Sequence, residues 1–132
     1  MCGIIGVVSK NNQIAETVVT SLKRLEYRGY DSAGIAVIGE NGILMVKDKG
    51  SVDNVAREID YPAMSGRVGI GHTRWATHGV PSKLNSHPHL DCTGRIAVAH
   101  NGIIENFLEL RRNLEEKGHR LVSQTDNEVI PH

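Results

Sequence analysis

The second residue of the chain is a cysteine, Cys2, which directly follows Met1. Cysteine is small enough for methionine trimming, and loss of Met1 would make Cys2 the N-terminal residue. Its thiol could then attack an electrophile while its own α-amine, whose ordinary pKa is roughly 7.7–8.0, accepts the proton. This arrangement predicts nucleophilic catalysis by an N-terminal cysteine. The alternative is a small apolar residue at the start of a buried strand.

A cluster of polar residues follows an apolar stretch at 71–79, which has the sequence Gly-His-Thr-Arg-Trp-Ala-Thr-His-Gly. The planar guanidinium of Arg74 matches a carboxylate group, and Thr77 and His78 add hydrogen-bonding groups close by. Such a cluster at the end of a strand favours a binding site. A structural ion pair beside a core Trp75 would explain the same residues.

A third polar cluster combines an amide side chain with a glycine. Asn101 and Gly102 follow the apolar residues 96–99, and the Asn amide and the Gly N–H could converge as donors on a developing oxyanion. Asn-Gly is also a common turn sequence. Further on, Asp126 could hold a substrate ammonium group, although Thr125-Asp126 is ordinarily a helix cap.

Two further segments carry polar groups but give weaker indications. Arg28 opens the turn-like segment 28–34, in which Asp and Ser side chains commonly satisfy local backbone donors. His87 and His89 form a His-x-His pair without a third ligand signal, so we expect no metal site and no cofactor. Cys92 also lacks a partner signal, and two cysteines do not predict a disulfide framework.

The composition excludes several functional classes. Fifteen basic residues balance fifteen acidic ones, so the chain has no electrostatic footprint for nucleic acid or an anionic membrane. No apolar run approaches the roughly 20 residues that span a bilayer. The first residues lack the basic segment of a secretory signal, and free thiols suit a reducing compartment. We therefore expect a cytoplasmic protein that binds neither nucleic acid nor membranes.

The hydrophobic pattern predicts a single α+β domain built mainly from antiparallel sheets. We expect strands at 2–8, 34–38, 43–46, 68–73, 96–100 and 119–123. Asn41-Gly42 predicts a hairpin between the second and third of these strands. Helices are expected over about 14–25, 52–59 and 105–117, with Gly29 and Gly118 ending the first and the third. A further helix begins at Thr125-Asp126.

Six segments occur in the order found in one enzyme family. They are Met-Cys-Gly-Ile-Ile-Gly at 1–6, Leu-Glu-Tyr-Arg-Gly-Tyr-Asp-Ser-Ala-Gly at 25–34, the cluster at 71–79, Asn-Ser-His-Pro-His at 85–89, His-Asn-Gly-Ile-Ile-Glu-Asn at 100–106, and Thr-Asp at 125–126. These segments resemble the glutaminase domain of the glutamine–fructose-6-phosphate aminotransferase (isomerising) family. Amidophosphoribosyltransferases share this class II glutamine amidotransferase domain but would differ at 27–31 and 74–78.

The resemblance implies a fold and a set of roles. The fold is a four-layer αββα sandwich of the N-terminal-nucleophile (Ntn) hydrolase type, incomplete here, with residues 1–132 as the N-terminal portion of the glutaminase domain. Glutamine would be hydrolysed through a thioester on Cys2, with Asn101 and the Gly102 N–H as the oxyanion hole. The remaining implied residues are Arg74 for the α-carboxylate of glutamine, Asp126 for its α-amino group, Thr77 and His78 in the pocket, Trp75 at the ammonia passage, and Arg28 in a loop beside the site.

The resemblance also implies what this chain would lack. Family members add the rest of the glutaminase domain and two sugar-isomerase domains, through which the full enzyme dimerises and aminates fructose 6-phosphate to glucosamine 6-phosphate. Three interpretations stay open: a glutamine-hydrolysing enzyme, an inactive fragment that folds only with another piece, and a regulatory glutamine-binding module. The fate of Met1 separates them, because a retained Met1 turns the Cys2 amine into an amide.

Overall fold

The computed structural model describes all residues from 1 to 132. The elements follow in the order β1 (Gly3–Val8), α1 (Ile14–Leu25), η1 (Glu26–Arg28), β2 (Ser32–Gly39), β3 (Gly42–Lys49), α2 (Val52–Glu58), β4 (Val68–Arg74), β5 (His89–Leu90), β6 (Ala97–Val98), α3 (Phe107–Glu116) and η2 (Asp126–Val129), where η marks a 3-10 helix. No helix is long and apolar enough to cross a membrane.

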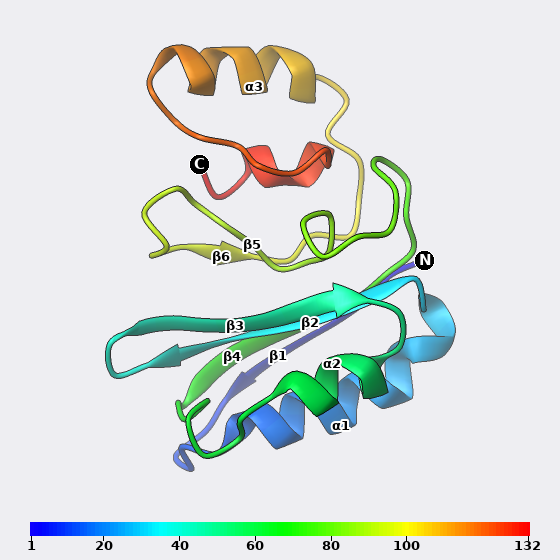
Figure 1. Cartoon of the computed structure of the whole chain (residues 1–132), viewed down its shortest axis with the longest axis vertical. Helices are drawn as coiled ribbons and strands as arrows, with labels where there is room; N and C mark the ends of the chain where they lie inside the picture. Colours follow the sequence, from blue (N-terminus) through cyan, green and yellow to red (C-terminus); the bar gives the residue numbers. More distant parts are fainter.

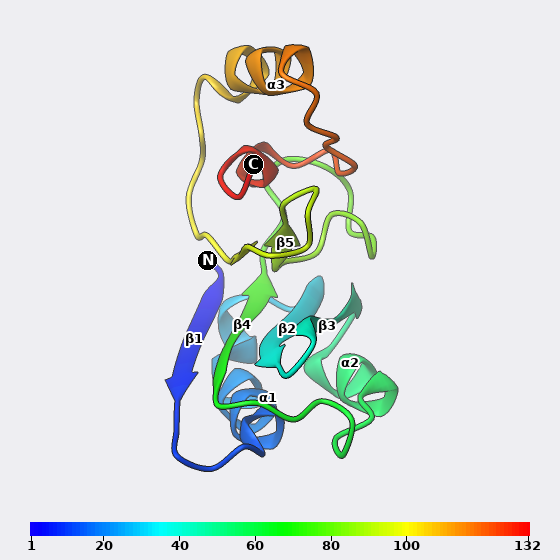
Figure 2. The ribbon, with the colours of Figure 1, turned by 90° about the vertical axis from the view of Figure 1, so that its left-hand side faces the viewer.

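Four strands form an antiparallel sheet in the order β1-β4-β2-β3. The predicted hairpin is confirmed, since β2 and β3 pair with Gly39 opposite Gly42 across the turn. β4 lies between β1 and β2, and its register places Thr73 opposite Gly3 and Arg74 opposite Ser32. The first residues of β1 and the last residues of β4 therefore lie side by side at one end of the sheet (Figure 2).

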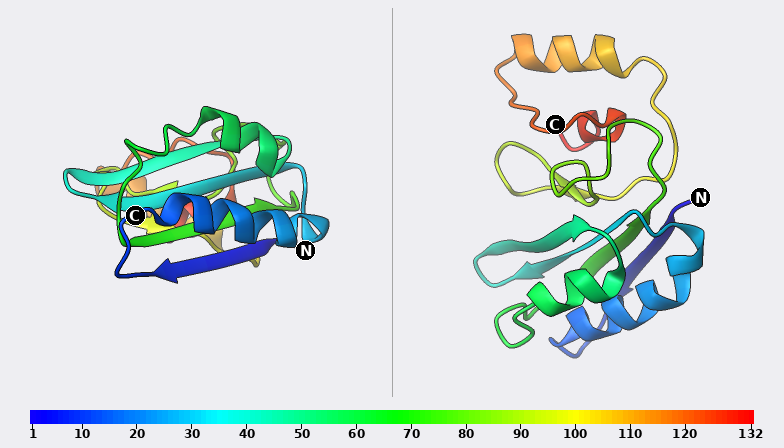
Figure 3. Two further views of the ribbon diagram at one scale, coloured as in Figure 1. Left: turned by 90° about the horizontal axis from the view of Figure 1, so that it is seen from below. Right: turned by 45° about the vertical axis from the view of Figure 1, so that its right-hand side comes forward.

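α1 and α2 cover one face of this sheet (Figures 1 and 3). The predicted apolar face of α1 is confirmed, and its Leu22 is 1% exposed. Ser51 caps α2, since its side chain accepts a hydrogen bond from the Asn54 N–H. The buried apolar core lies between the helices and the sheet and comprises Ile14, Ala15, Val18, Val19, Leu22, Ala33, Ile35, Val37, Val52, Val55, Ile59 and Met64.

The rest of the chain lies over the opposite face of the four-stranded sheet (Figure 1). β5 and β6 form a small antiparallel sheet of two residues per strand. η2 and then α3 lie beyond it, so the order of layers is helices, sheet, sheet, helix (Figure 1). This arrangement confirms the predicted α+β sandwich, with a second sheet that is small in this chain.

The interior of this second part is mostly polar. Its buried residues include Asn85, Ser86, His87, His89, Ser123, Thr125, Asp126, Asn127, Glu128 and Val129. Glu128 is 2% exposed, and its carboxylate accepts hydrogen bonds from the N–H groups of Val122 (2.8 Å) and Ser123 (2.6 Å) and from the Ser123 hydroxyl (2.6 Å). Hydrogen bonds to charged groups therefore stabilise this part of the fold, whereas apolar burial stabilises the part around α1.

Several local predictions are wrong, and the structure gives the reasons. No strand forms at 119–123, because side chains satisfy that backbone: Arg111 donates to the carbonyls of Leu121 and Ser123, and Glu128 accepts from the amides. The strand at 96–100 shortens to β6, and β5 was missed because only two residues pair. Gly118 does end α3, with φ +91°.

Gly29 has a different role from the predicted helix cap. Its φ of −171° is extended backbone, which any residue adopts. A Cβ atom at this position would lie 2.7 Å from the Arg74 carbonyl carbon and 2.9 Å from the Trp75 nitrogen. The glycine is therefore needed because the backbone after η1 packs directly against the end of β4.

Replacing Leu22 with Ala should lower the free energy of unfolding by about 2–5 kcal/mol, because the buried side chain leaves a cavity between α1 and the sheet. Urea unfolding followed by circular dichroism measures the change. Leu108→Ala on α3 is the matched control, since Leu108 is 58% exposed and its truncation should change stability by no more than about 0.5 kcal/mol. Equal losses in the two variants would contradict the assignment of the core.

Candidate active site

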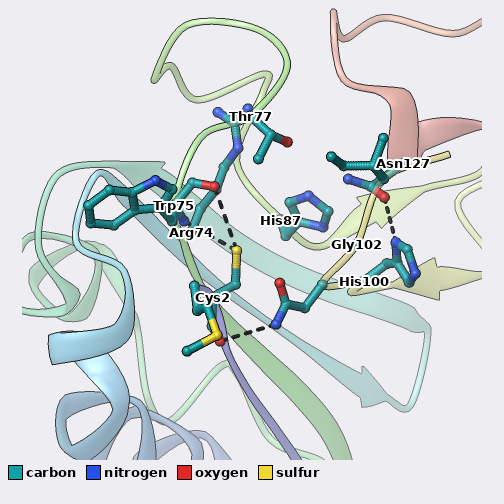
Figure 4. Close-up of a pocket in the computed structure, with 11 residues that line it drawn as sticks. Cys2, Arg74, Trp75, Thr77, His87, His100, Gly102 and Asn127 are labelled. Carbon is teal, nitrogen blue, oxygen red and sulfur yellow. Dashed lines mark hydrogen bonds between the residues drawn. The ribbon is translucent and has the colours of Figure 1, made fainter. Parts of the chain in front are cut away.

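The clusters predicted from the sequence meet at a cavity of about 290 Å³ at the sheet end where β1 begins and β4 ends. The loop after β6 and the first turn of η2 complete its wall. The lining residues are Met1, Cys2, Arg74, Trp75, Thr77, His87, His100, Asn101, Gly102, Ile103 and Asn127 (Figure 4). Six of the nine predicted site residues line this cavity, because segments that are far apart in the sequence converge here.

Cys2 lies at the edge of the β1–β4 pair, partly exposed to the cavity. The Trp75 N–H donates to its sulfur at 3.2 Å, and the thiol lies 3.7 Å from the Trp75 carbonyl oxygen. The Gly3 N–H donates to the Thr73 hydroxyl at 3.1 Å, which fixes the backbone next to the thiol. A backbone N–H directed at the sulfur offers a hydrogen bond to a thiolate.

Asn101 and Gly102 face the start of β1 from the loop after β6. The Asn101 amide nitrogen donates to the Cys2 carbonyl oxygen at 3.5 Å, so the amide lies next to the nucleophile candidate. No group of the chain accepts the Gly102 N–H. Two donors therefore lie beside Cys2, one of them free, as the oxyanion hypothesis requires.

Asp126 holds this loop in place. It is 1% exposed, its Oδ2 accepts from the Ile104 N–H at 2.7 Å, and its Oδ1 accepts from the Asn127 amide at 3.0 Å. The next residue, Asn127, binds the His100 ring nitrogen at 2.5 Å. The start of η2 thus fixes both ends of the segment that carries Asn101.

Arg74 is 3% exposed and reaches the cavity from the end of β4. Its Nη2 donates to the carbonyls of His78 and Gly79, the latter at 3.0 Å, while Nη1 is buried without a partner. Burial lowers the pKa of Arg74, and the charges of Asp31, Cys2 and Asp126 oppose the shift. A fixed guanidinium with one free nitrogen at a cavity is suited to bind a carboxylate.

Three predicted site residues do not line the cavity. Asp126 lies behind the loop, and His78 Nδ1 lies 3.7 Å from Asp126 Oδ1 with its ring edge-on to Phe107. Arg28 contacts Met1, with 3.9 Å between Nη2 and the Met1 sulfur. Arg28 therefore adjoins the cavity through Met1. Asp126 contacts the loop that lines the cavity, and His78 contacts Asp126.

Sequence reasoning missed several residues of the site. His87, His100 and Asn127 line the cavity, although His100 was quoted only as part of the Asn-Gly segment. Asp31 was read as a local turn residue, and its Oδ1 does accept from the Ser32 hydroxyl, but its Oδ2 also accepts from the distant Ala76 N–H. A spacing pattern gives no signal for such contacts between segments.

Three buried histidines lie beneath the cavity. The rings of His72 and His87 stack at 4.2 Å, and His87 meets His89 edge-on at 4.5 Å. Burial lowers the pKa of His72 to about 4 and that of His89 to about 3, and it also lowers the pKa of His87. All three rings are therefore neutral at pH 7, and they pack against one another in one layer.

Comparison with known proteins agrees with this geometry. Residues 56–132 match the family model of the glutamine amidotransferase domain. Over its whole length the chain is 57% identical to glutamine–fructose-6-phosphate aminotransferase (isomerizing) from Aeropyrum pernix, 54% to that from Pyrococcus horikoshii and 53% to that from Streptomyces coelicolor. It spans 22% of the length of each of these relatives.

Solved structures show the same fold. Glutamine phosphoribosylpyrophosphate amidotransferase from B. subtilis, in complex with ADP and GMP, superposes with a TM-score of 0.78 over 98% of this chain and 28% of its own, at 26% identity. An allosteric regulatory enzyme of purine biosynthesis superposes equally well, at 27% identity. Fold and site define an amidotransferase domain of the Ntn type. The chain belongs to the glutamine amidotransferase domain family, an enzyme family, and its sequence is similar to the N-terminal part of the fructose-6-phosphate aminotransferases.

Acid should destabilise the fold through the buried histidines. The folded-state pKa values of His72 and His89 lie below the ordinary value of 6.5, so the unfolded chain binds more protons as the pH falls below about 6.5. The contribution of each such histidine to the free energy of unfolding is fully present above about pH 6.5. Below that pH the free energy of unfolding falls by up to about 1.4 kcal/mol per pH unit for each histidine, until the pH passes the folded-state pKa. Urea unfolding at pH 7.5, 6, 5 and 4.5 measures the slope. His72→Gln should reduce it, and an unchanged slope would contradict this explanation.

Proposed function

We propose that this chain supplies the glutamine-hydrolysing site of an enzyme that transfers the amide nitrogen of glutamine to fructose 6-phosphate. The observation that carries the proposal is that Cys2, Asn101, Gly102 with its free N–H, and Arg74 line one cavity. Family membership and whole-chain identity of 52–57% to the aminotransferases support the choice of reaction.

The reaction would begin with removal of Met1. Met1 lines the cavity and is 74% exposed, so its loss would both free the Cys2 amine and enlarge the space for substrate. The amine would accept the thiol proton as sulfur attacks the δ-carbon of glutamine. The carbon–nitrogen bond then breaks, ammonia leaves with the proton returned to it, and water hydrolyses the resulting thioester to glutamate.

The oxyanion of each tetrahedral intermediate would be stabilised by Asn101 Nδ2 and the Gly102 N–H. Asn101 now donates a long bond of 3.5 Å to the Cys2 carbonyl, and exchange of that weak bond for a developing oxyanion costs little. Asp126 contacts Ile104, and Asn127 contacts His100, so the loop is already fixed before the substrate binds. Preorganised donors of this kind lower the barrier because they need not reorient.

Arg74 would bind the α-carboxylate of glutamine through its unpartnered Nη1, with the Thr77 hydroxyl beside it. We assign the α-amino group to Asp126, although its carboxylate is buried beside the cavity and does not line it. Substrate binding would have to open a path to Oδ1, which would exchange its bond from the Asn127 side-chain amide for one from the substrate, while Oδ2 keeps its bond from the Ile104 N–H. His78, 3.7 Å from that Oδ1, would keep the carboxylate oriented.

Trp75 and Arg28 would act at the edge of the site. The Trp75 ring is 51% exposed and meets Tyr30 edge-on at 5.8 Å, which suits a side chain at the passage through which ammonia leaves. Arg28 contacts Met1 and would belong to a loop beside the site.

The acceptor of the nitrogen and the oligomeric state depend on the parts of the relatives that this chain does not span. We propose fructose 6-phosphate as acceptor, because the relatives' names give it and their sequences are 56–57% identical to this chain. A homodimer formed through isomerase domains and a cytoplasmic location are proposed from the family resemblance alone. Phosphoribosylpyrophosphate amidotransferase chemistry is the second candidate, but its representative is only 26% identical. An inactive fragment and a regulatory glutamine-binding module are separated from the enzyme by the measurements below.

Cys2→Ala should abolish glutamine hydrolysis while glutamine still binds, because the variant loses the nucleophile and keeps Arg74 and Thr77. Glutamate release by the full-length protein measures hydrolysis, and calorimetry measures glutamine binding. Intact mass reports whether Met1 is removed. Val8→Ala, at the other end of β1 and 81% exposed, is the control and should hydrolyse glutamine normally. Hydrolysis by Cys2→Ala at the parent rate would disprove the mechanism, and binding without hydrolysis in the parent would favour the regulatory module.

Asn101→Ala should reduce kcat by about 10²–10³ with a smaller change in KM, because one oxyanion donor acts mainly in the transition state. Steady-state kinetics of glutamine hydrolysis provide the comparison. The control is Asn113→Ala on the exposed side of α3, which should leave both constants as they are. A change in KM alone would make Asn101 a substrate-positioning residue and remove it from the oxyanion hole.

A further inference from the structure

Three side chains with metal-binding atoms meet away from the cavity, in the part of the chain that lacks an apolar core cluster. Cys92 lies in the turn between β5 and β6, His119 follows α3, and His132 follows η2. One ligand atom from each can be chosen so that all three lie within 4.8 Å of one another. Sequence spacing offers no indication of this group, because its members are 27 and 13 positions apart.

The geometry of the group suits a shared ion. Cys92 Sγ lies 3.5 Å from His119 Nδ1, and the rings of His119 and His132 meet edge-on with centroids 5.6 Å apart. Ligand atoms of a tetrahedral zinc site lie about 2.0–2.3 Å from the metal, which places them roughly 3.3–3.8 Å from each other. Small side-chain rotations would bring the three atoms into that range.

His132 provides a second and independent observation. Its side chain is 1% exposed, and neither ring nitrogen has a hydrogen-bond partner. The nearest acceptor, Glu128 Oε1, lies 3.7 Å from Nε2 and already accepts the Val122 N–H at 2.8 Å. A buried imidazole with two unsatisfied nitrogens is unfavourable, and a metal bound to one of them would remove most of that penalty.

We propose that Cys92, His119 and His132 bind a zinc-class divalent transition-metal ion. A thiolate and two imidazoles are the ligands that zinc prefers, whereas Mg²⁺ and Ca²⁺ prefer oxygen. Binding releases the Cys92 thiol proton to solvent and forms one metal–sulfur and two metal–nitrogen bonds. Cys92 is exposed, so the ion can enter from solvent and keep water as its fourth ligand.

The bound ion would connect separate segments of the chain and would take no part in glutamine hydrolysis. None of its three residues lines the cavity of Cys2, and together they connect the β5–β6 turn, the segment after α3 and the segment after η2. These segments are otherwise held by polar contacts such as those of Glu128. The ion would therefore stabilise η2 and, through Asp126, the loop that carries Asn101.

Metal titration of the full-length protein tests the site. After removal of metals with a chelator, Zn²⁺ should bind at one equivalent per chain, and Co²⁺ should give an intense thiolate-to-metal charge-transfer band. Cys92→Ser should eliminate that band, and His119→Gln and His132→Gln should each weaken Co²⁺ binding by about 100-fold or more, since loss even of an outer-shell partner costs 10–100-fold. Zn²⁺ should also slow amide exchange in residues 119–132 of the parent.

Cys2→Ser is the matched control for the thiol, and His78→Gln for an imidazole. Both should bind one Zn²⁺ with the parent's affinity and retain the charge-transfer band. The proposal fails if the parent shows no charge-transfer band, if Cys92→Ser keeps it, or if Cys2→Ser loses it. These outcomes are independent of glutamine hydrolysis, so failure here leaves the proposed function intact.

Discussion

The antiparallel pairing of β1 with β4 is the constraint on which the site depends. Its register sets Gly3 opposite Thr73, so the residue before β1 and the residue after β4 become neighbours and the Trp75 N–H reaches the Cys2 sulfur at 3.2 Å. A slip of one residue would turn alternate side chains to the other face. Gly29 allows the backbone after η1 to pack against the end of β4, because a Cβ atom there would lie 2.7 Å from the Arg74 carbonyl carbon.

The two parts of the molecule are stabilised in different ways. Around α1 the fold relies on apolar burial, whereas the part beyond β4 relies on buried polar groups with several partners each. Lys47 links the two: its Nζ donates to the carbonyls of Ser86 at 2.7 Å and Pro88 at 2.9 Å, and burial lowers its pKa to about 8 against the charge of Glu128. Loss of one partner in such a network leaves a buried group unsatisfied, which costs more than the bond itself contributed.

Asp126 is buried next to the cavity and contacts the loop that lines it. The sequence allowed either a helix cap or an ammonium anchor. The structure shows no side-chain cap at the start of η2, and the Asp126 carboxylate instead accepts a hydrogen bond from the Ile104 N–H. Its substitution would then disturb the loop that carries Asn101 and Gly102. The same reasoning makes Asn127 part of the site, since it contacts the His100 ring beside the Asn101 loop.

The sequence by itself determined the α+β class, the helical face of α1, the β2–β3 hairpin, and the segments that hold Cys2, Arg74 and Asn101. Each of these depends on local periodicity, turn chemistry or residue type, which are written in neighbouring positions. The failed strand at 119–123, the short β5–β6 pair and the layer of His72 and its neighbours were decided only by the tertiary structure. A strand exists only when a partner pairs with it, and a buried polar group is stable only when distant segments supply its contacts, so neither is encoded in any short stretch of the chain.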